Sequence, residues 1–320
     1  MCIRDRYLSG FKISDDSSLS LEVINWLKKD YDLIVIGGYS TPTGMLAIKY
    51  LNFKGIPFII NSDGGIIKEK ENKLKYHLKK HLISTASAWL STGKKTNEYL
   101  IYYGANRDMI FEYPFTSIKE EDILKEPISK NKKQTLKRDL NIEEKKIILS
   151  IGQFIERKGF DILLKSAKSL NNNIGIYIIG GKPTQKYLEL KNKLKLNNVH
   201  FIDFMNKEKL KRYYLSADLF VLPTREDIWG LVINEAMANG LPVITTDKCV
   251  AGLELIEDDK NGYIIPVDNE TILSEKIIKI LNDIDLMEKI SENNLKKIRD
   301  YTIQKMAKKH IDILNKIIQN

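Results

Sequence analysis

The sequence is poor in cysteine and histidine and contains no long apolar run. Among 320 residues there are two cysteines, Cys2 and Cys249, and four histidines. Because there is no Cys-x-x-Cys pair and no cysteine–histidine cluster, the chain predicts neither a disulfide framework nor a zinc site. No apolar run approaches the roughly 18–20 residues that span a bilayer, and the amino terminus lacks the pattern of a signal peptide. We therefore expect a cytoplasmic protein.

The signatures of two other kinds of binding site are also missing. Gly37, Gly38 and Gly44 follow a predicted strand, but their spacing is not the G-x-G-x-x-G of a dinucleotide-binding loop. Nothing resembles the aromatic motifs or zinc fingers that read nucleic acid, so no nucleic-acid partner is expected. The chain does carry 51 Lys and Arg against 42 Asp and Glu, a net charge of +9. This charge favours anionic partners such as nucleotides and acidic lipid surfaces.

The elements that are present indicate an α/β protein. Hydrophobic residues make up 43% and charged residues 29% of the chain, and its length suits two domains. Apolar runs that predict strands alternate with helical periodicity in both halves. Strands are predicted over 32–36, 57–61, 88–91, 109–113, 147–151, 174–179, 199–202, 217–222 and 241–246. Helices are predicted over 22–28, 43–53, 74–83, 94–103, 187–196, 207–215, 231–238 and from about 271 onward.

The stretch 221–246, VLPTREDIWGLVINEAMANGLPVITT, contains the clearest sign of a ligand site. An apolar run ending at Leu222 predicts a buried strand, and Pro223 ends it. A loop with two carboxylates and a glycine follows, and then apolar residues recur at helical spacing up to Asn239 and Gly240. A further buried strand completes the unit. This order is typical of a parallel sheet whose ligands lie beyond the carboxyl ends of the strands.

The residue types in this loop suit a ligand with phosphate and hydroxyl groups. A helix that starts near Gly230 presents free N–H groups and a partial positive charge, which favour phosphate. Asp227 and Glu235 supply hydrogen-bond acceptors for hydroxyl groups. Because Glu235 lies only about one and a half turns into the helix, we expect both carboxylates to share one pocket. The simpler alternative is a helix-capping Asp with an acidic first turn, which stabilises a helix by about 1 kcal/mol.

These residues resemble the hallmark of the retaining glycosyltransferases of the GT-B fold, family 4, also called glycosyl transferases group 1. The family pattern is E-x-F-G-L-x-x-x-E-A-M-A, and residues 227–238, DIWGLVINEAMA, match it with Asp for the first Glu and Trp for Phe. The resemblance implies that Asp227 contacts hydroxyls of the donor sugar and that Glu235 contacts the ribose of the nucleotide. It also implies that Gly230 lets backbone N–H groups approach the diphosphate.

A second family motif, G-R-x-x-x-x-K-G-x-D-x-L, resembles residues 152–163, GQFIERKGFDIL. Lys158 matches the lysine that neutralises the donor diphosphate, whereas Gln153 stands where the family has arginine. A glutamine donates hydrogen bonds but lacks the charge, so we expect Arg157 or Arg225 to supply part of the positive field. For Arg157, a local surface role remains the alternative.

Three further candidates rest on weaker matches. Residues 251–264 resemble the family's G-G-x-x-E-x-I and N-G-x-L tail, which makes Gly252 and Glu254 candidate donor contacts, with capping and turn roles as the alternative. Asp63 ends a predicted strand where the family often places a His or Asp near the donor sugar; a local turn is the alternative. The candidates are therefore catalytic Asp227, Glu235 and Lys158, donor-binding Gly152, Gln153, Arg157, Glu226, Gly230, Leu231, Gly252 and Glu254, and acceptor-side Asp63.

The resemblance implies two Rossmann-like domains that face a cleft. We expect an amino-terminal domain over 1–116, a charged linker over 117–145 and a nucleotide-sugar-binding domain over 146–300. The family's last helix crosses back to the first domain, and residues 301–320 are the candidate. Because only about four strands precede the linker, we expect the amino-terminal domain to be truncated.

The implied function is transfer of a sugar, with retention, from a nucleoside-diphosphate sugar to a glycan or lipid-linked acceptor in cell-surface polysaccharide synthesis. No cofactor and no metal ion are expected. Two alternatives stay open: a sugar-nucleotide epimerase of related fold, and a non-catalytic nucleotide-sugar-binding relative.

One segment of the amino-terminal half suggests a membrane surface. Residues 68–81, KEKENKLKYHLKKH, predict a basic helix with Leu74, Leu78 and Leu82 on one stripe and Lys73, Lys79 and Lys80 elsewhere. Such a helix could rest on an anionic membrane where lipid-linked acceptors lie. The alternative is a solvated lysine-rich face.

Overall fold

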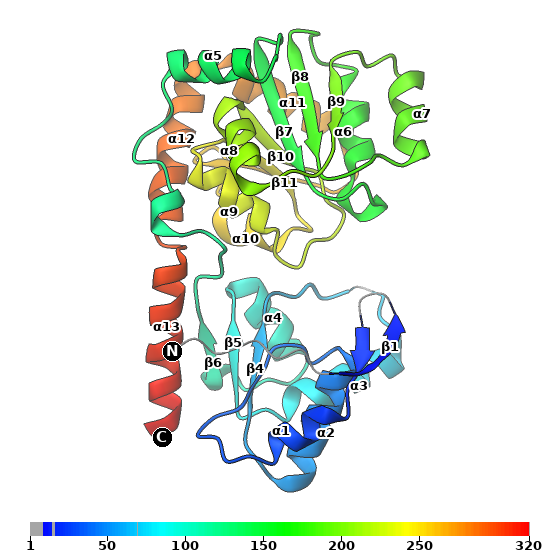
Figure 1. Ribbon diagram of the computed structural model, residues 1–320, viewed down its shortest axis with the longest axis vertical. Coiled ribbons are helices and arrows are strands. Elements are labelled where there is room, and N and C mark those ends of the chain that lie inside the picture. Colours follow the sequence, from blue (N-terminus) through cyan, green and yellow to red (C-terminus); the bar gives the residue numbers. More distant parts are fainter. Residues whose placement is uncertain (1–8, 15–16, 69, 320) are drawn as a thin grey trace. The chain divides into compact units, whose positions relative to one another are not determined.

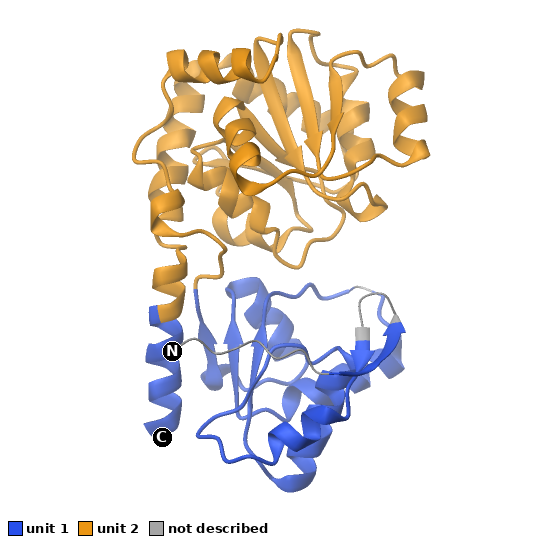
Figure 2. Ribbon diagram, viewed as in Figure 1, with its two compact units in different colours: residues 1–113, 308–320 blue, residues 114–307 orange. Residues whose placement is uncertain are grey.

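The computed structural model describes residues 9–14, 17–68 and 70–319 and divides into two compact units (Figures 1 and 2). Unit 1 comprises residues 1–113 and 308–320, and unit 2 comprises residues 114–307. Each unit contains a parallel sheet with helices packed on it, so the predicted α/β class is confirmed. Cys2 and the chain's first residues lie outside the described part.

Unit 1 is built on a parallel sheet with strand order β3-β4-β5-β6. The strands are β3 (Val35–Ile36), β4 (Ile59–Ser62), β5 (Ala88–Ser91) and β6 (Ile110–Glu112). The helices are α1 (Glu22–Leu27), α2 (Pro42–Lys54), α3 (Lys73–Ser84) and α4 (Lys94–Tyr102), with the 3-10 helix η1 (Arg107–Met109). A core that includes Phe58, Ile60, Leu82 and Leu100 lies between sheet and helices.

Two features of unit 1 differ from the sequence prediction. The strand predicted over 32–36 is reduced to the two residues of β3, because β3 is an edge strand that pairs only with β4 and leaves Val35 42% exposed. A short antiparallel hairpin of β1 (Phe11–Ser14) and β2 (Ser17–Leu19) was not predicted. Its segments are too short and polar to show an apolar period.

Unit 2 contains a six-stranded parallel sheet with the order β12-β11-β10-β7-β8-β9. The strands are β7 (Lys146–Ile151), β8 (Ile174–Ile179), β9 (Val199–Ile202), β10 (Leu219–Leu222), β11 (Val243–Thr246) and β12 (Gly262–Ile265). The helices are α5 (Lys130–Asp139), α6 (Phe160–Ala167), α7 (Gln185–Lys193), α8 (Lys207–Ser216), α9 (Leu231–Ala238), α10 (Val250–Leu255), α11 (Glu270–Asn282) and α12 (Ile284–Ile298), with 3-10 helices η2 (Glu120–Asp122) and η3 (Glu156–Lys158). The helix α13 (Ile303–Gln319) contributes residues to both units.

The segment 117–145, which was expected to be a linker, contains η2 and α5 and belongs to unit 2. Helix α5 packs against α8, and Lys133 and Lys137 both form ion pairs with Asp218. The sequence KNKKQTLKRD has no apolar stripe, so hydropathy could not indicate a packed helix. An ion pair with a residue about eighty positions away fixes it instead.

Candidate functional site

The structure brings the two motifs of unit 2 together through one ion pair. Lys158 ends η3, which follows β7, and Asp227 lies in the loop that follows β10. The Nζ atom of Lys158 lies 2.6 Å from Oδ2 of Asp227, and the two side chains are 15% and 13% exposed. Because β7 and β10 are adjacent and parallel, both loops leave the same carboxyl edge of the sheet. This edge therefore holds a partly buried lysine and carboxylate side by side.

The close approach of the two loops depends on Gly159. This residue has φ of +66°, and a Cβ atom here would lie 1.9 Å from the carbonyl oxygen of Pro223. The hydroxyl of Thr224 donates to the carbonyl oxygen of Arg157 at 2.9 Å, and the backbone N–H of Arg225 donates to the same oxygen at 2.7 Å. Only glycine permits this backbone contact.

Two arginines fasten the loops further. The Nη1 atom of Arg157 donates to the carbonyl oxygen of Glu226 at 2.7 Å and lies 3.8 Å from Oδ1 of Asp227. The guanidinium group of Arg225 donates both of its terminal nitrogens to Asp161 at 2.8 Å, and its Nε lies 2.7 Å from Asp268. Two carboxylates thus neutralise Arg225. Arg225, one of the two arginines from which positive field was expected, is thus paired within the protein, where it joins η3, α6 and the signature loop (residues 225–230).

The signature loop is fixed on its other side by the segment that follows β11. The backbone N–H of Asp227 donates to the carbonyl oxygen of Lys248 at 2.9 Å, and that of Ala251 donates to Trp229 at 2.9 Å. Gly230 has φ of +100°, and a Cβ atom there would lie 2.9 Å from Sγ of Cys249. Burial raises the pKa of the Cys249 thiol to about 12, and the nearby Asp227 charge adds to this shift. The thiol is therefore neutral, and it serves packing rather than nucleophilic chemistry.

Helix α9 begins at this loop without a side-chain cap. Gly230 is its N-cap residue and Leu231 its first residue, so no side-chain hydrogen bond caps the positive end of the helix. Trp229, which replaces the family's Phe, is 4% exposed and donates its indole N–H to Asn234 at 2.9 Å. Its ring packs edge-on against Phe115. The start of α9 is thus held rigidly beside Asp227.

Glu235 has a different set of partners from Asp227. It accepts a hydrogen bond of 2.8 Å from the hydroxyl of Tyr214 on α8. Burial raises the pKa of Glu235, and the hydrogen bond from Tyr214 only partly opposes this shift. The two carboxylates thus have different protein partners, Lys158 of η3 for Asp227 and Tyr214 of α8 for Glu235. That they share one pocket stays a prediction.

The remaining unit 2 candidates vary in their setting. Gly152 has φ of +155° and lies against the side chain of Lys158, whereas Gln153 is exposed. Glu226 contributes its carbonyl oxygen to Arg157. Gly252 packs against Thr245 of β11, where a Cβ atom would lie 2.3 Å from Cγ2, so it has a packing role. Glu254 is half-buried on α10.

Asp63 belongs to unit 1, where it follows β4. Its carboxylate accepts hydrogen bonds from the hydroxyl of Tyr113 at 3.5 Å and from the amide of Asn61 at 3.4 Å. Desolvation by the surrounding groups raises the pKa of Asp63, and the Tyr113 hydroxyl opposes the shift. The ring of Tyr113 lies 4.2 Å from that of His310 on α13.

Sequence reasoning missed several residues that position this site. Nothing in the sequence linked Tyr214 to Glu235, because the two lie on different helices and the contact is tertiary. The role of Asp161 as the partner of Arg225 had a signal, since Asp161 is part of the second motif, but that motif does not reveal its partner. Asn234 lies inside the matched segment, but at a position where the family pattern specifies no residue type.

Within the described ranges, no group of three or more His, Cys, Asp or Glu side chains is arranged to hold a metal ion. No helix in the described part of the chain is long and apolar enough to cross a membrane.

Comparison with solved structures places this architecture among known folds. The chain is similar to Anabaena HepE crystallised with UDP-glucose, with a TM-score of 0.74 at 16% identity over 91% of this chain and 79% of that chain. Together with the two parallel α/β units, this likeness defines a fold of the GT-B type. The chain belongs to the family described as glycosyl transferases group 1, whose model matches residues 132–297.

Curated relatives match over part of their length. An uncharacterised glycosyltransferase of Methanocaldococcus jannaschii is 29% identical over 193 residues, which cover 58% of this chain and 49% of that protein. The N,N'-diacetylbacillosaminyl-diphospho-undecaprenol alpha-1,3-N-acetylgalactosaminyltransferase of Campylobacter jejuni is 26% identical over 196 residues, or 60% of this chain and 50% of that protein. The chain thus spans about half the length of the curated relatives it matches.

Proposed function

We propose that this protein transfers a sugar from a nucleoside-diphosphate sugar to an acceptor hydroxyl, with retention at the anomeric carbon. The observation that carries the proposal is the Lys158–Asp227 pair beside the uncapped start of α9. A lysine ammonium has three donors, and Asp227 uses one of them, so two remain for phosphate oxygens. Backbone N–H groups at the start of α9 would bind the same diphosphate.

The proposed chemistry needs no base buried in the protein. The bond between the anomeric carbon and the diphosphate oxygen breaks, and a bond to the acceptor oxygen forms on the same face. The departing phosphate oxygen takes the acceptor's proton. Lys158 and the start of α9 stabilise the charge that develops on that oxygen, which is how an enzyme selectively lowers a transition-state energy. Asp227 would hold sugar hydroxyls, and Glu235 the ribose.

A lipid-linked acceptor and a role in cell-surface polysaccharide synthesis are part of this proposal. The name of the Campylobacter relative, which specifies a diphospho-undecaprenol substrate, supports such an acceptor. Anabaena HepE, crystallised with UDP-glucose, supports a uridine-diphosphate sugar as the donor.

The exposed face of α3 supports residence at the inner face of a membrane. Leu74 is 80% and Leu78 40% exposed, whereas Leu82 is buried, so the predicted leucine stripe runs from the surface into the core. Lys79 pairs with Glu71 at 2.6 Å, but Lys73 and Lys75 flank the exposed leucines. Flotation with anionic liposomes tests this proposal: salt-sensitive binding that Leu74→Glu abolishes is expected, and equal flotation of both proteins contradicts it.

The transferase proposal is tested in two steps. A panel of nucleotide sugars is screened by thermal shift, because a ligand at 100 times its dissociation constant adds about 2.7 kcal/mol of stability. The stabilising donor is then incubated with and without acceptors and the products are analysed. A glycosylated acceptor is expected; a new nucleotide sugar without acceptor would indicate an epimerase, and binding without turnover a non-catalytic protein.

Two variants connect the activity with the site. Glu235→Ala should abolish transfer by weakening ribose binding without unfolding unit 2. Glu208→Ala, an exposed carboxylate on α8, serves as the matched control and should retain activity. Retained transfer in Glu235→Ala would contradict the assignment.

A further inference from the structure

A cavity lies at the opposite edge of the unit 2 sheet from the candidate donor site. It has a volume of about 850 Å³ and is lined by residues that precede β7, β10 and β11, together with α5 and the start of α12. Lys158 and Asp227 follow the carboxyl ends of β7 and β10, whereas this cavity lies at the amino ends. With roughly 3.3 Å per residue, the six-residue β7 separates the two sites by about 20 Å.

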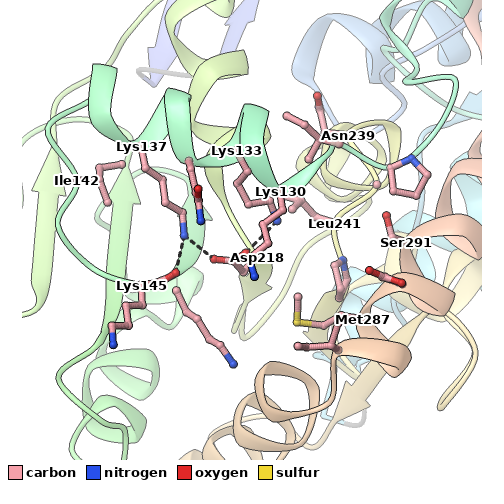
Figure 3. A pocket seen from close by; sticks show the side chains of 18 of the residues that line it. Lys130, Lys133, Lys137, Ile142, Lys145, Asp218, Asn239, Leu241, Met287 and Ser291 are labelled. Atoms are coloured by element: carbon pink, nitrogen blue, oxygen red, sulfur yellow. Dashed lines mark hydrogen bonds and ion pairs between the residues drawn. The ribbon is translucent and has the colours of Figure 1, made fainter.

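The cavity carries more positive than negative charge. Six Lys or Arg side chains line it against four carboxylates. Figure 3 shows Lys133 and Lys137 reaching from α5 to the same carboxylate, Asp218. The two Nζ atoms lie 2.9 and 3.0 Å from its oxygens, and all three side chains are less than one fifth exposed. One partly buried carboxylate therefore has to balance two ammonium groups.

The charge of Asp218 is already committed to the protein. Its Oδ2 also accepts the backbone N–H of Ile147 at 2.8 Å, and Lys137 donates additionally to the carbonyl oxygen of Lys145. Lys130, one α-helical turn before Lys133, also lines the cavity; its side chain is exposed and has no ion-pair or hydrogen-bond partner within the described ranges. Its ammonium group is therefore available to pair with the anionic group of a ligand beside Lys133.

The wall opposite α5 is partly apolar, because α12 contributes Ile284 and Met287 to it beside Glu288 and Ser291. Met287 on α12 faces the lysines across the cavity (Figure 3), and the buried residues Leu241 and Ile142, 3% and 8% exposed, also line it. The volume falls within the range of about 300–1,000 Å³ that is typical of organic ligands and exceeds what a bare inorganic anion fills. A ligand that satisfies both walls has an anionic head and an apolar body.

We propose that this cavity binds a phosphorylated amphiphile, with its phosphate held by Lys130 and Lys133 and its apolar body packed against Met287. A phosphomonoester carries about −1.5 to −2 charges near neutral pH, which matches an excess of six cations over four carboxylates better than a monoanion does. Lysine binds phosphate as a point charge without requiring a planar partner. The site is independent of the proposed sugar transfer.

The test titrates the full chain with n-octyl phosphate, below its micelle concentration, by isothermal calorimetry. One molecule per chain is expected to bind. Inorganic phosphate, which lacks the apolar chain, and octanol, which lacks the phosphate, should each bind at least about tenfold more weakly. Lys130→Ala should weaken octyl phosphate binding about tenfold because a charge-assisted contact is lost. Lys132→Ala, an exposed lysine of the same helix outside the cavity, should change affinity less than about twofold.

Three results would overturn the proposal. Equal affinity of Lys130→Ala and the unchanged protein for octyl phosphate would show that Lys130 does not hold the phosphate group. If inorganic phosphate bound as tightly as octyl phosphate, the octyl chain would make no favourable contact with the apolar residues of the cavity. If excess UDP displaced octyl phosphate, the octyl phosphate would be binding at the candidate donor site and not in this cavity. Because none of these readouts uses sugar transfer, their failure is distinct from failure of the proposed function.

Discussion

A single guanidinium group, that of Arg225, joins the loops that hold Lys158 and Asp227. Its planar fork matches the two oxygens of Asp161, while Nη1 also reaches the carbonyl oxygen of Glu156 at 2.7 Å. Lysine has the same charge but lacks the fork, so it cannot reproduce this set of contacts. Arg225 is therefore a positioning residue for the candidate donor site.

Arg225→Lys should raise the KM for the nucleotide sugar about tenfold and leave the KM for the acceptor unchanged. The reason is that η3 and the signature loop move relative to each other while the charge stays. Lys165→Ala, which removes the weaker partner of Asp161, 3.6 Å away and 42% exposed, should leave both constants unchanged. Steady-state kinetics of the three proteins provide the measurement, and an equal rise in both KM values would argue for general misfolding instead.

Glu235 gives the stability of the protein a defined pH dependence. Burial is the largest cause of its raised pKa, so ionising this carboxyl costs more in the folded than in the unfolded chain. Its contribution to stability is thus fully present below the ordinary value near 4.5 and is lost as the pH rises through the raised value. Glu235→Gln removes the loss, so the variant should gain stability relative to the unchanged protein between about pH 4 and about pH 8.

Urea unfolding at both pH values measures this effect. Tyr214→Phe is the complementary variant, because it removes a donor that favours the ionised carboxylate and should enlarge the pH-dependent loss. If Glu235→Gln has the same stability difference at both pH values, the burial of Glu235 does not act as described.

For the residues of the candidate site, the sequence predicted which residue types are present better than it predicted their contacts. The two motifs correctly indicated that Lys158 and Asp227 belong to loops at one sheet edge, because a strand–loop–helix pattern determines where a loop lies. The partners of Glu235 and Arg225 could not be predicted, since Tyr214 and Asp161 lie on helices whose packing depends on the whole unit. The roles of the candidates toward a donor stay predictions.

The backbone segments around Gly159 and Pro223 approach each other closely. Gly159 and Gly55 have the same left-handed φ of +66°, but only Gly159 has a backbone atom in the place of a Cβ. The two glycines therefore separate the cost of conformation from the cost of contact.

Gly55→Ala should lower the free energy of unfolding by about 1 kcal/mol, because the only cost is that of holding alanine in the left-handed conformation. Gly159→Ala should cost distinctly more, and it should also weaken donor binding because η3 carries Lys158 away from Asp227. Thermal unfolding and donor titration measure both effects. Equal destabilisation by the two substitutions would show that η3 accommodates the added methyl group.

Helix α5 is one of the elements that the sequence did not predict. Most strands and helices were predicted to within a few residues because their apolar periods are clear. In α5 only Leu136 is apolar, and the stabilising contacts are ionic. The buried carboxylate of Asp218 stabilises the packed position of α5, because it forms ion pairs with Lys133 and Lys137. Burial alone would raise the pKa of Asp218, but Lys133 and Lys137 outweigh burial and lower it.

Unit 1 contains two separate parts of the chain. Residues 308–319 of α13 belong to unit 1, where Lys316 lies over the ring of Phe111 in β6 and His310 packs against Tyr113. On this helix segment Ile313 is 5% exposed and Ile311 is 59% exposed. The pair offers a buried and an exposed isoleucine within one turn.

Ile313→Asp should lower the stability of unit 1 by about 3 kcal/mol or more, because it buries a charge without a partner. Ile311→Asp should change stability by less than about 0.5 kcal/mol, because the side chain stays in water. Hydrogen exchange of the amides in β4 and β5 reports on unit 1 separately from unit 2. Similar exchange in both variants would mean that α13 does not complete the unit 1 core.

The division of unit 1 between two chain segments affects the order of events during protein synthesis. Strands β3–β6 leave the ribosome well before α13, because all of residues 114–307 are translated in between. At about 5–20 residues per second, this delay lasts on the order of ten seconds or more. Unit 2 can complete its own core first, while the apolar surface that α13 will cover stays open to chaperones or to other nascent chains.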